Sequence, residues 1–303
     1  MNAPTLTTKF RKVLRSRGVA GTLVAAGRHL FRPRPKTLEN WKGLVNEKRG
    51  FEIGGPSPMF GRNGTLPIYP LIAGLDNCNF SSSTVWEGDI SEGVKFVYDS
   101  ARAPGRQYIA EATDLGMIQS GTYDFALSCH SLEHTANPLR ALTEWKRILK
   151  EGGALLLVVP HKEDSFDHRR PLTKLDHLVD DFKKCTGEDD ATHLAEVLKF
   201  HDIDRDWGSP DWPAFEERTK KNFENRCMHQ HVFDTSLVAH MLDYLGMQLL
   251  SIEALRPFHI IIASRKLPAN EKPRNESLLS AGAEWRRASP FRIDRERDGN
   301  GKP

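Results

Sequence analysis

The stretch YDFALSCHSLEHTANPLRALTEWKRILKEGGALLLVVP, residues 123–160, decides the fold. It begins with an apolar run that predicts a strand. Asn137-Pro138 then predicts the start of a helix, because proline suits a first helical turn, and the apolar residues that follow share one helix face. Gly152-Gly153 predicts the end of that helix. The continuous apolar run 154–159 is typical of a strand buried on both faces of a parallel sheet.

Similar patterns extend on both sides of this stretch. Strands are predicted over residues 50–55, 71–76, 107–110, 247–254 and 258–264, with a helix over 236–245. The last two strands are joined by so short a link that they must pair antiparallel. Short buried strands separated by helices favour an α/β fold with a doubly wound, mostly parallel sheet.

The remaining segments interrupt or flank this pattern. Residues 161–228 are rich in His, Asp and Trp and are interpreted as an insertion or cap on a core formed by residues 43–160 and 229–266. Residues 1–42 form a basic N-terminal segment that could contain an amphipathic helix. Residues 267–303 are polar and lack periodicity, so we expect them to be disordered.

Composition excludes several classes of protein. Six Trp, fifteen Phe and 39% hydrophobic residues are too many for a disordered chain. No apolar run approaches the roughly 18 to 20 residues of a membrane span, which excludes an integral membrane protein. The four cysteines form no CxxC pair, so we expect a reducing compartment and a cytoplasmic protein.

Charge is unevenly distributed along the chain. Residues 1–42 hold ten Lys and Arg but one acid, whereas the net charge of the whole chain is +3. Basic ends are either solvated tails or contacts with an anionic surface. We expect no nucleic-acid partner, and we leave open a peripheral membrane contact through residues 1–36.

Four parts of the chain together resemble a class I S-adenosylmethionine-dependent methyltransferase of the type 11, small-molecule kind. They are residues 52–55, Asp76, residues 111–115 and residues 123–160. The resemblance implies a Rossmann-like, seven-stranded, mostly parallel sheet with an antiparallel C-terminal hairpin. It also implies an enzyme that uses S-adenosylmethionine as cofactor and methylates a small-molecule or glycan-like acceptor.

The resemblance also implies where the cofactor binds. Gly54 and Gly55 let the backbone approach the ligand closely, and an acid at the end of the next strand can accept both ribose hydroxyl protons. His130, beyond the fourth strand, is the candidate catalytic base, because a neutral imidazole can accept a proton near pH 7. The implied cofactor contacts are Glu52, Gly54, Gly55, Asp76, Glu111, Ala112, Thr113, Asp114, Ser128 and Cys129.

The insertion offers candidate acceptor contacts. Its arginines would suit an anionic or sugar-phosphate acceptor. Within it, His193 and Glu196 share a helix face, and His229 and His231 would point the same way on a strand. Such groups could bind a metal, but no HExxH or facial-triad spacing is present, so we expect no metal. The predicted acceptor contacts are His134, His168, Arg169, Arg170 and His177.

Two alternatives remain open. Pro56 and Pro58 stand where the family usually carries glycines, and proline has a fixed φ and no N–H to donate. The chain could therefore be a non-catalytic binding or scaffold protein with the methyltransferase fold. A metal-dependent hydrolase built on the His and Asp residues of the insertion is the third hypothesis.

Overall fold

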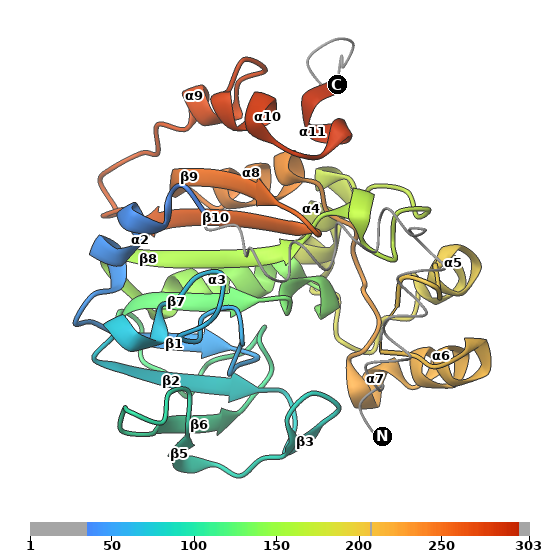
Figure 1. Ribbon diagram of the computed structural model, residues 1–303, viewed down its shortest axis with the longest axis horizontal. Helices are drawn as coiled ribbons and strands as arrows, with labels where there is room; N and C mark the ends of the chain where they lie inside the picture. Colours follow the sequence, from blue (N-terminus) through green and yellow to red (C-terminus); the bar gives the residue numbers. More distant parts are fainter. Residues whose placement is uncertain (1–34, 207, 297–303) are drawn as a thin grey trace.

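The central feature of the computed structural model is one mixed sheet, whose strands lie in the order β5-β6-β2-β1-β7-β8-β10-β9 (Figure 1). The structure describes residues 35–206 and 208–296. The strands of this sheet are β1 (Arg49–Ile53), β2 (Gly74–Asn79), β5 (Gly93–Phe96), β6 (Gly105–Ile109), β7 (Tyr123–Cys129), β8 (Leu149–Pro160), β9 (Met247–Leu255) and β10 (His259–Lys266). A small hairpin, β3 (Ser83–Thr84) and β4 (Gly88–Asp89), stands apart from it.

Strand directions confirm the expected mostly parallel sheet. Strands β6, β2, β1, β7 and β8 are parallel, and the terminal pair β9 and β10 is antiparallel, as the short link between them predicts. The prediction of seven strands is wrong, because β5 pairs antiparallel with β6 at one edge and makes eight. This strand is short and mostly exposed, so its sequence carries no apolar pattern.

Strand β8 contributes side chains to the apolar clusters on both faces of the sheet, as its uninterrupted apolar run predicts. Leu155, Leu157 and Val159 pack into the cluster on one face of the sheet. Leu156 and Val158 belong to the cluster on the opposite face. Burial on both faces explains why the sequence of this strand does not alternate between polar and apolar residues.

One face of the sheet is covered by α3 (Pro138–Ile148) and α8 (Thr235–Tyr244). Each begins at a capping side chain, which is Asn137 for α3 and Asp234 for α8. The opposite face is covered by α2 (Leu38–Val45) and the segment between β1 and β2. As its prolines and glycines predict, this segment holds a 3₁₀ turn, η1 (Tyr69–Leu71), and no α-helix among the described residues.

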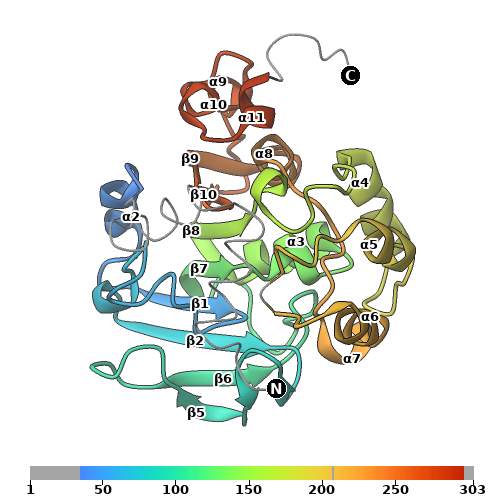
Figure 2. The same ribbon diagram turned by 45° about the vertical axis from the view of Figure 1, so that its right-hand side comes forward.

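The helices of residues 161–228, here called the cap, lie beyond the carboxyl ends of the parallel strands (Figures 1 and 2). They are α4 (Leu175–Lys184), α5 (Leu194–Phe200), α6 (Trp212–Lys220) and α7 (Asn222–Asn225). Their buried apolar cluster contains Val197, Phe215 and Met228. Buried ion pairs supplement it, among them Arg170 with Asp167 over 2.9 Å.

The C-terminal segment corrects a prediction. We expected disorder over residues 267–303, but α9 (Glu276–Leu279), α10 (Glu284–Ala288) and α11 (Arg292–Glu296) pack beside β9 and α8 (Figure 1). Trp285 joins the main apolar cluster, and buried Asp294 accepts hydrogen bonds from Thr235 over 2.7 Å and Ser289 over 2.6 Å. Single buried side chains on such short helices produce no periodic pattern of apolar residues in the sequence.

Two expectations concern the N-terminal segment and membranes. The predicted basic helix lies in residues 1–34, outside the described residues. Among the described residues, none of the helices combines the length and apolar character that crossing a membrane requires.

Candidate functional site

The carboxyl edge of the parallel strands brings together part of the predicted site. The turn Gly54-Gly55 follows β1, Asn79 ends β2, Glu111 follows β6 and His130 follows β7. Ligands of open α/β sheets bind at this edge, outside the strand ends. The cap lies over the same edge (Figure 2).

The glycine turn after β1 leaves no space for side chains. Gly54 has φ +76°, and a Cβ there would lie 2.4 Å from Ser131 Oγ. A Cβ on Gly55 would lie 2.2 Å from the carboxyl carbon of Glu52. The Gly55 N–H donates to Asn77 Oδ1 over 3.0 Å, and its carbonyl accepts from Asn79 Nδ2 over 3.2 Å. The turn is therefore held against the end of β2.

Glu52 lies beneath this turn and is fully buried. The Tyr69 hydroxyl is 2.9 Å from Oε1 and 2.8 Å from Oε2, and the Ser57 N–H donates to Oε1 over 3.1 Å. Burial raises the pKa of Glu52 to about 8 despite these hydrogen bonds. The group is therefore mostly neutral at pH 7 and supports the turn from inside.

Asp76 does not lie at the strand end, which corrects the predicted ribose contact. It stands opposite Phe51 within β2, and the strand continues to Asn79. The Asp76 carboxylate accepts from the Tyr123 hydroxyl over 2.8 Å and from the Arg106 N–H over 2.8 Å. The polar side chain at the carboxyl end of β2 is that of Asn79, which the sequence analysis missed.

Of the two acids in residues 111–115, Glu111 is the one that lies at the carboxyl edge of the parallel strands. Its Oε1 accepts from Arg226 Nη2 over 2.6 Å. Arg226 belongs to the cap, is buried, and has its Cζ 5.2 Å from the centre of the Phe80 ring. A cap side chain therefore lies between the end of β2 and the segment after β6.

The residues after Glu111 are engaged elsewhere. The Ala112 carbonyl accepts from Trp145 Nε1 over 2.9 Å, and the Thr113 carbonyl accepts from Arg140 Nε over 3.2 Å, so both face α3. The Asp114 carboxylate accepts from the Gly116 N–H over 3.1 Å in an exposed turn. Contacts of these three residues with a cofactor stay a prediction.

Ser128 and Cys129 are the last two residues of β7. Ser128 is fully buried, and its hydroxyl has no hydrogen-bond partner among the described residues. Burial raises the pKa of the Cys129 thiol, so it stays protonated near neutral pH. A protonated thiol is a poor nucleophile, which agrees with a role in lining the strand end.

His130 lies at the centre of a polar group beyond β7. It has φ +53°, an uncommon conformation for a residue other than glycine. Its Nδ1 is 3.2 Å from Glu133 Oε1, and its Nε2 is 2.9 Å from His259 Nδ1. Burial alone would raise the pKa of Glu133, but the hydrogen bond and charge of His130 and the nearby His134 and His229 lower it. The ionised carboxylate therefore orients the His130 ring.

Glu133 also adjoins a second pair of imidazoles. His134 Nδ1 is 3.2 Å from the Met228 carbonyl, and His229 Nδ1 is 2.5 Å from Asp167 Oδ2. Donation from each Nδ1–H leaves each Nε2 with a free lone pair. One donor atom from each of Glu133, His134 and His229 lies within 4.8 Å of the others, so this group could hold a divalent cation.

The predicted acceptor contacts in the cap are mainly paired with acids. Arg170 is fully buried, and its guanidinium donates to Asp167, Glu196 and two backbone carbonyls. An acceptor cannot reach it, so its predicted role is wrong. His168 and Arg169 both contact Asp202, at 2.8 and 3.2 Å. His177 lies among other cap histidines.

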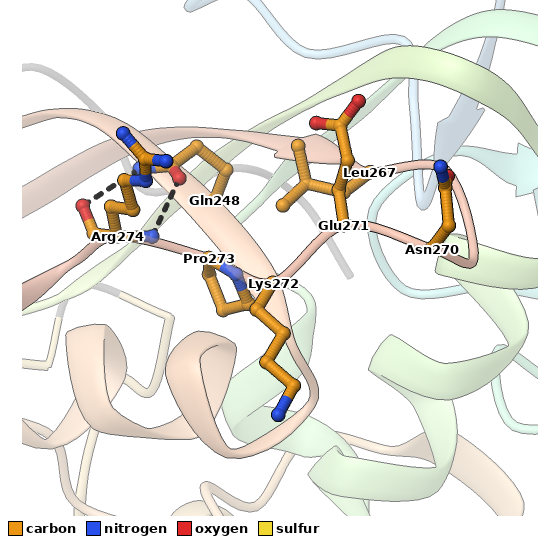
Figure 3. Close-up of a pocket in the computed structure, with 7 residues that line it drawn as sticks. All are labelled: Gln248, Leu267, Asn270, Glu271, Lys272, Pro273 and Arg274. Carbon is orange, nitrogen blue, oxygen red and sulfur yellow. Dashed lines mark hydrogen bonds between the residues drawn. The ribbon is translucent and has the colours of Figure 1, made fainter.

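A shallow pocket of about 520 Å³ lies elsewhere, beside Gln248 and residues 267–274 (Figure 3). Gln248 and Arg274 are joined across it by hydrogen bonds of 2.8 and 3.2 Å. Because β10 runs antiparallel to β8, the end of β10 lies at the amino edge of the parallel strands. This pocket is therefore on the opposite side of the sheet from the candidate site.

Comparisons with known proteins agree with this geometry. A protein-family model described as a methyltransferase domain matches residues 73–157. A search of curated protein sequences found no match.

Three solved structures illustrate the fold similarity. An S-adenosylmethionine-dependent methyltransferase from Mesorhizobium loti is 13% identical, with 76% of this chain and 96% of that chain covered and a TM-score of 0.46. One from Methanosarcina mazei is 14% identical, with 77% and 98% covered and a TM-score of 0.41. The 1,6-didemethyltoxoflavin-N1-methyltransferase of Burkholderia thailandensis is 11% identical, with 88% and 94% covered and a TM-score of 0.42.

The segment matched by the family model runs from the start of β2 into β8 and includes the glutamate after β6 and the histidine after β7. Residues 73–157 of this chain are therefore similar to a methyltransferase domain.

Proposed function

We propose that this chain transfers a methyl group from S-adenosylmethionine to a hydroxyl group of a small-molecule or glycan-like acceptor. The observation that carries the proposal is the contact of His130 with Glu133 and His259 beyond the end of β7. An oxygen nucleophile needs a base to remove its proton. A histidine oriented by a buried carboxylate suits that task near pH 7.

The residues of the carboxyl edge fit a nucleoside cofactor. The Ala110 N–H donates to the Asn79 carbonyl over 2.9 Å, so the ends of β2 and β6 lie side by side. Asn79 and Glu111 supply hydrogen-bonding groups, and the Phe80 ring between them supplies an apolar surface. We propose that Asn79 takes the ribose role expected of Asp76, and that Glu111 accepts a hydrogen bond from the adenine. Gly54 and Gly55 would adjoin the amino-acid end of the cofactor.

The proposed mechanism depends on which ring nitrogens of His130 and His259 donate hydrogen bonds and which accept them. When bound, S-adenosylmethionine supplies a methyl group activated by its sulfonium. Glu133 accepts the His130 Nδ1–H, which leaves the His130 Nε2 lone pair to face His259 Nδ1–H. The acceptor hydroxyl would give its proton to His259 Nε2 as its oxygen attacks the methyl carbon, while the His259 Nδ1 proton passes to His130 Nε2. The resulting imidazolium is stabilised by the Glu133 carboxylate, and positioning supplies much of the remaining rate enhancement.

The cap would select the acceptor. It adjoins the carboxyl edge through Arg226, which pairs with Glu111, and His229 just after the cap lies 3.9 Å from Glu133. His168 and Arg169, by contrast, both contact Asp202. We therefore propose His134 as the acceptor contact that adjoins the catalytic histidine. A small molecule or a terminal sugar is the class of acceptor that a cap of this kind admits. A cytoplasmic location, with peripheral membrane contact through residues 1–36, is part of the same proposal.

Calorimetry with the full-length protein and S-adenosylhomocysteine tests the cofactor step. Saturable binding with one ligand per chain is expected. If folded protein gives no heat up to millimolar ligand, the scaffold hypothesis motivated by Pro56 and Pro58 replaces the enzyme. Methyl transfer from radiolabelled S-adenosylmethionine to a panel of phenols, sugars and amines then tests the acceptor class. Transfer to amines alone would overturn the hydroxyl acceptor.

A further inference from the structure

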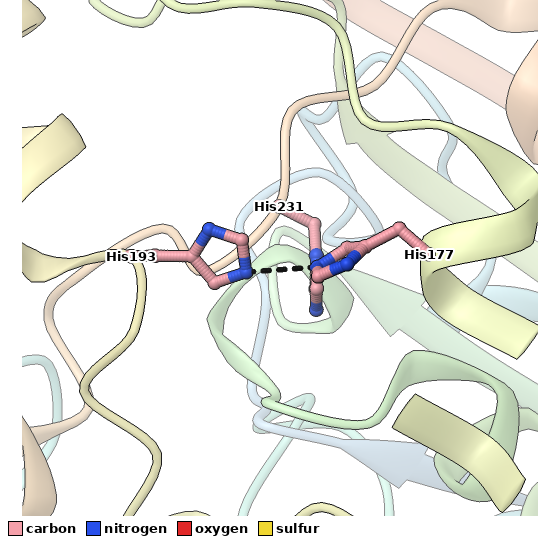
Figure 4. A group of neighbouring side chains, drawn as sticks. All are labelled: His177, His193 and His231. Carbon is pink, nitrogen blue, oxygen red and sulfur yellow. Dashed lines mark hydrogen bonds between the residues drawn. The ribbon is translucent and has the colours of Figure 1, made fainter. Parts of the chain in front are cut away.

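Two histidines of the cap and one from the segment just after it lie close together (Figure 4). His177 lies on α4, His193 immediately precedes α5, and His231 lies in the segment between α7 and α8. One ring nitrogen of each lies within 4.8 Å of the other two, and the Nε2 atoms of His177 and His193 are 3.1 Å apart. Segments more than 50 residues apart in the sequence therefore meet at their imidazoles.

The tautomer of His231 leaves one nitrogen available to a ligand. Its Nε2 lies 3.1 Å from the Ala136 carbonyl, to which it can only donate. Its Nδ1 then carries a lone pair, and this atom is buried and has no hydrogen-bond partner among the described residues. A buried hydrogen-bond acceptor without a partner lowers the stability of the folded protein. A metal ligand typically has this arrangement, with the second ring nitrogen fixed by a backbone carbonyl.

The spacing suits a zinc ion. Zinc–nitrogen bonds of about 2.0–2.1 Å in a tetrahedron place ligand nitrogens roughly 3.3 Å apart. The 3.1 Å between His177 and His193 is close to that value. Asp181, one helical turn after His177 on α4, has Oδ2 3.3 Å from His177 Nε2, so a carboxylate adjoins one of the three nitrogens.

We propose that His177, His193 and His231 bind one Zn²⁺, which ties α4, the start of α5 and the segment before α8 together. A zinc ion there would stabilise the cap, whose own apolar cluster is small. His231 also bonds to Ala136 in the turn before α3, so the ion would anchor the cap to the sheet domain. We expected no metal from the sequence, because the chain has no HExxH or facial-triad spacing.

The test measures zinc binding by untagged, full-length protein after removal of metals with a chelator. Titration with ZnCl₂ alone, followed by calorimetry or a competing indicator, is expected to give a Kd of about 1 μM or tighter. Bound zinc should also raise the Tm by several degrees. It should slow proteolysis within residues 161–228, a readout that does not depend on methyl transfer.

Variants separate this site from the Glu133 group. His177→Ala and His193→Ala are used because their rings are less buried than that of His231 and their loss is less disruptive to folding. Each should weaken zinc binding by roughly 100-fold or more. His168→Ala, which removes a cap histidine that pairs with Asp202, is the matched control and should bind zinc like the unaltered chain.

His134→Ala identifies the alternative site. If it abolishes zinc binding while His193→Ala does not, the ion belongs to the group of Glu133, His134 and His229, and the proposal is overturned. Absence of zinc binding by the folded, unaltered chain would overturn it as well. Circular dichroism of each variant establishes that lost binding does not reflect unfolding.

Discussion

Arg226 of the cap donates a hydrogen bond of 2.6 Å to Glu111, which follows β6 in the sheet domain. The same guanidinium lies over the Phe80 ring and has its Nε 3.7 Å from Glu188. Arg226 therefore links the cap to the segments that follow β2 and β6. A ligand that uses Glu111 must share the carboxylate with Arg226 or displace it.

Removal of this arginine should destabilise the protein. Arg226→Met leaves the Glu111 and Glu188 carboxylates without their cation. We expect the free energy of unfolding to fall by about 1–3 kcal/mol, because Arg226 is buried but Glu111 is about a third exposed and partly screened. Urea denaturation measures this change, with Arg292→Met as a control at an exposed surface pair. An unchanged urea midpoint for Arg226→Met would show that the ion pair of Arg226 with Glu111 contributes nothing to stability.

We propose Asn79 rather than Asp76 as the ribose contact, and variants of the two residues test this choice together. Asn79→Ala should weaken S-adenosylhomocysteine binding about tenfold, which corresponds to one lost hydrogen bond. Asp76→Asn should change the affinity less than twofold, roughly 0.4 kcal/mol. It should instead lower stability, because the Asp76 carboxylate accepts hydrogen bonds from the buried Tyr123 hydroxyl and from the backbone N–H of Arg106. Calorimetry measures both variants. The opposite ranking would restore Asp76 to the site.

The sequence predicts strands well where apolar character alone defines them. The run 154–159 lies within β8, and α3 and the terminal hairpin form where they were predicted. The predicted helix end at Gly152-Gly153 is wrong, because α3 ends at Ile148 and both glycines lie within β8. Strand β2 is different, because its second half contains Asn77 and Asn79. These buried amides are satisfied by Gly55 and Gln107, which only the folded chain brings near. The predicted strand therefore ended three residues early and put Asp76 at the edge.

The candidate site was predictable only where its residues are close in sequence. Residues 128–134 contain Ser128, Cys129, His130 and Glu133 in one stretch that spans the end of β7. His259 reaches His130 across 129 residues, and Arg226 reaches Glu111 across 115. Neither pair forms a local motif, because tertiary packing of the cap and of β10 creates both contacts.

Buried Glu52 predicts an unusual pH dependence of stability. Its pKa rises from 4.5 to about 8 on folding, so the folded state binds its proton more tightly. The resulting stabilisation is complete below pH 4.5 and is lost as the pH rises through about 8. Between these values the contribution falls by about 1.4 kcal/mol per pH unit.

Glu52→Gln isolates this contribution, since the amide resembles the neutral carboxyl and still accepts from Tyr69. Denaturation at pH 5 and pH 8 should show that the variant gains a few kcal/mol relative to the unaltered chain at the higher pH. Other titrating groups cancel in the comparison. Parallel pH curves for the two proteins would contradict a neutral, buried Glu52.

The last prediction concerns the proposed base. His130→Gln removes the proton acceptor but keeps a polar side chain beside Glu133, so methyl transfer to a hydroxyl acceptor should fall by about 10²–10⁴-fold. Binding of S-adenosylhomocysteine should change little, because the proposed cofactor contacts come from β1, β2 and β6. His240→Ala is the matched control, since this imidazole bonds to the Ser236 carbonyl on α8. A lost base also predicts that the variant's residual rate rises with pH, as a larger fraction of the acceptor ionises in solution. A rate within tenfold of the unaltered chain, at equal cofactor affinity, would assign the proton transfer to another group.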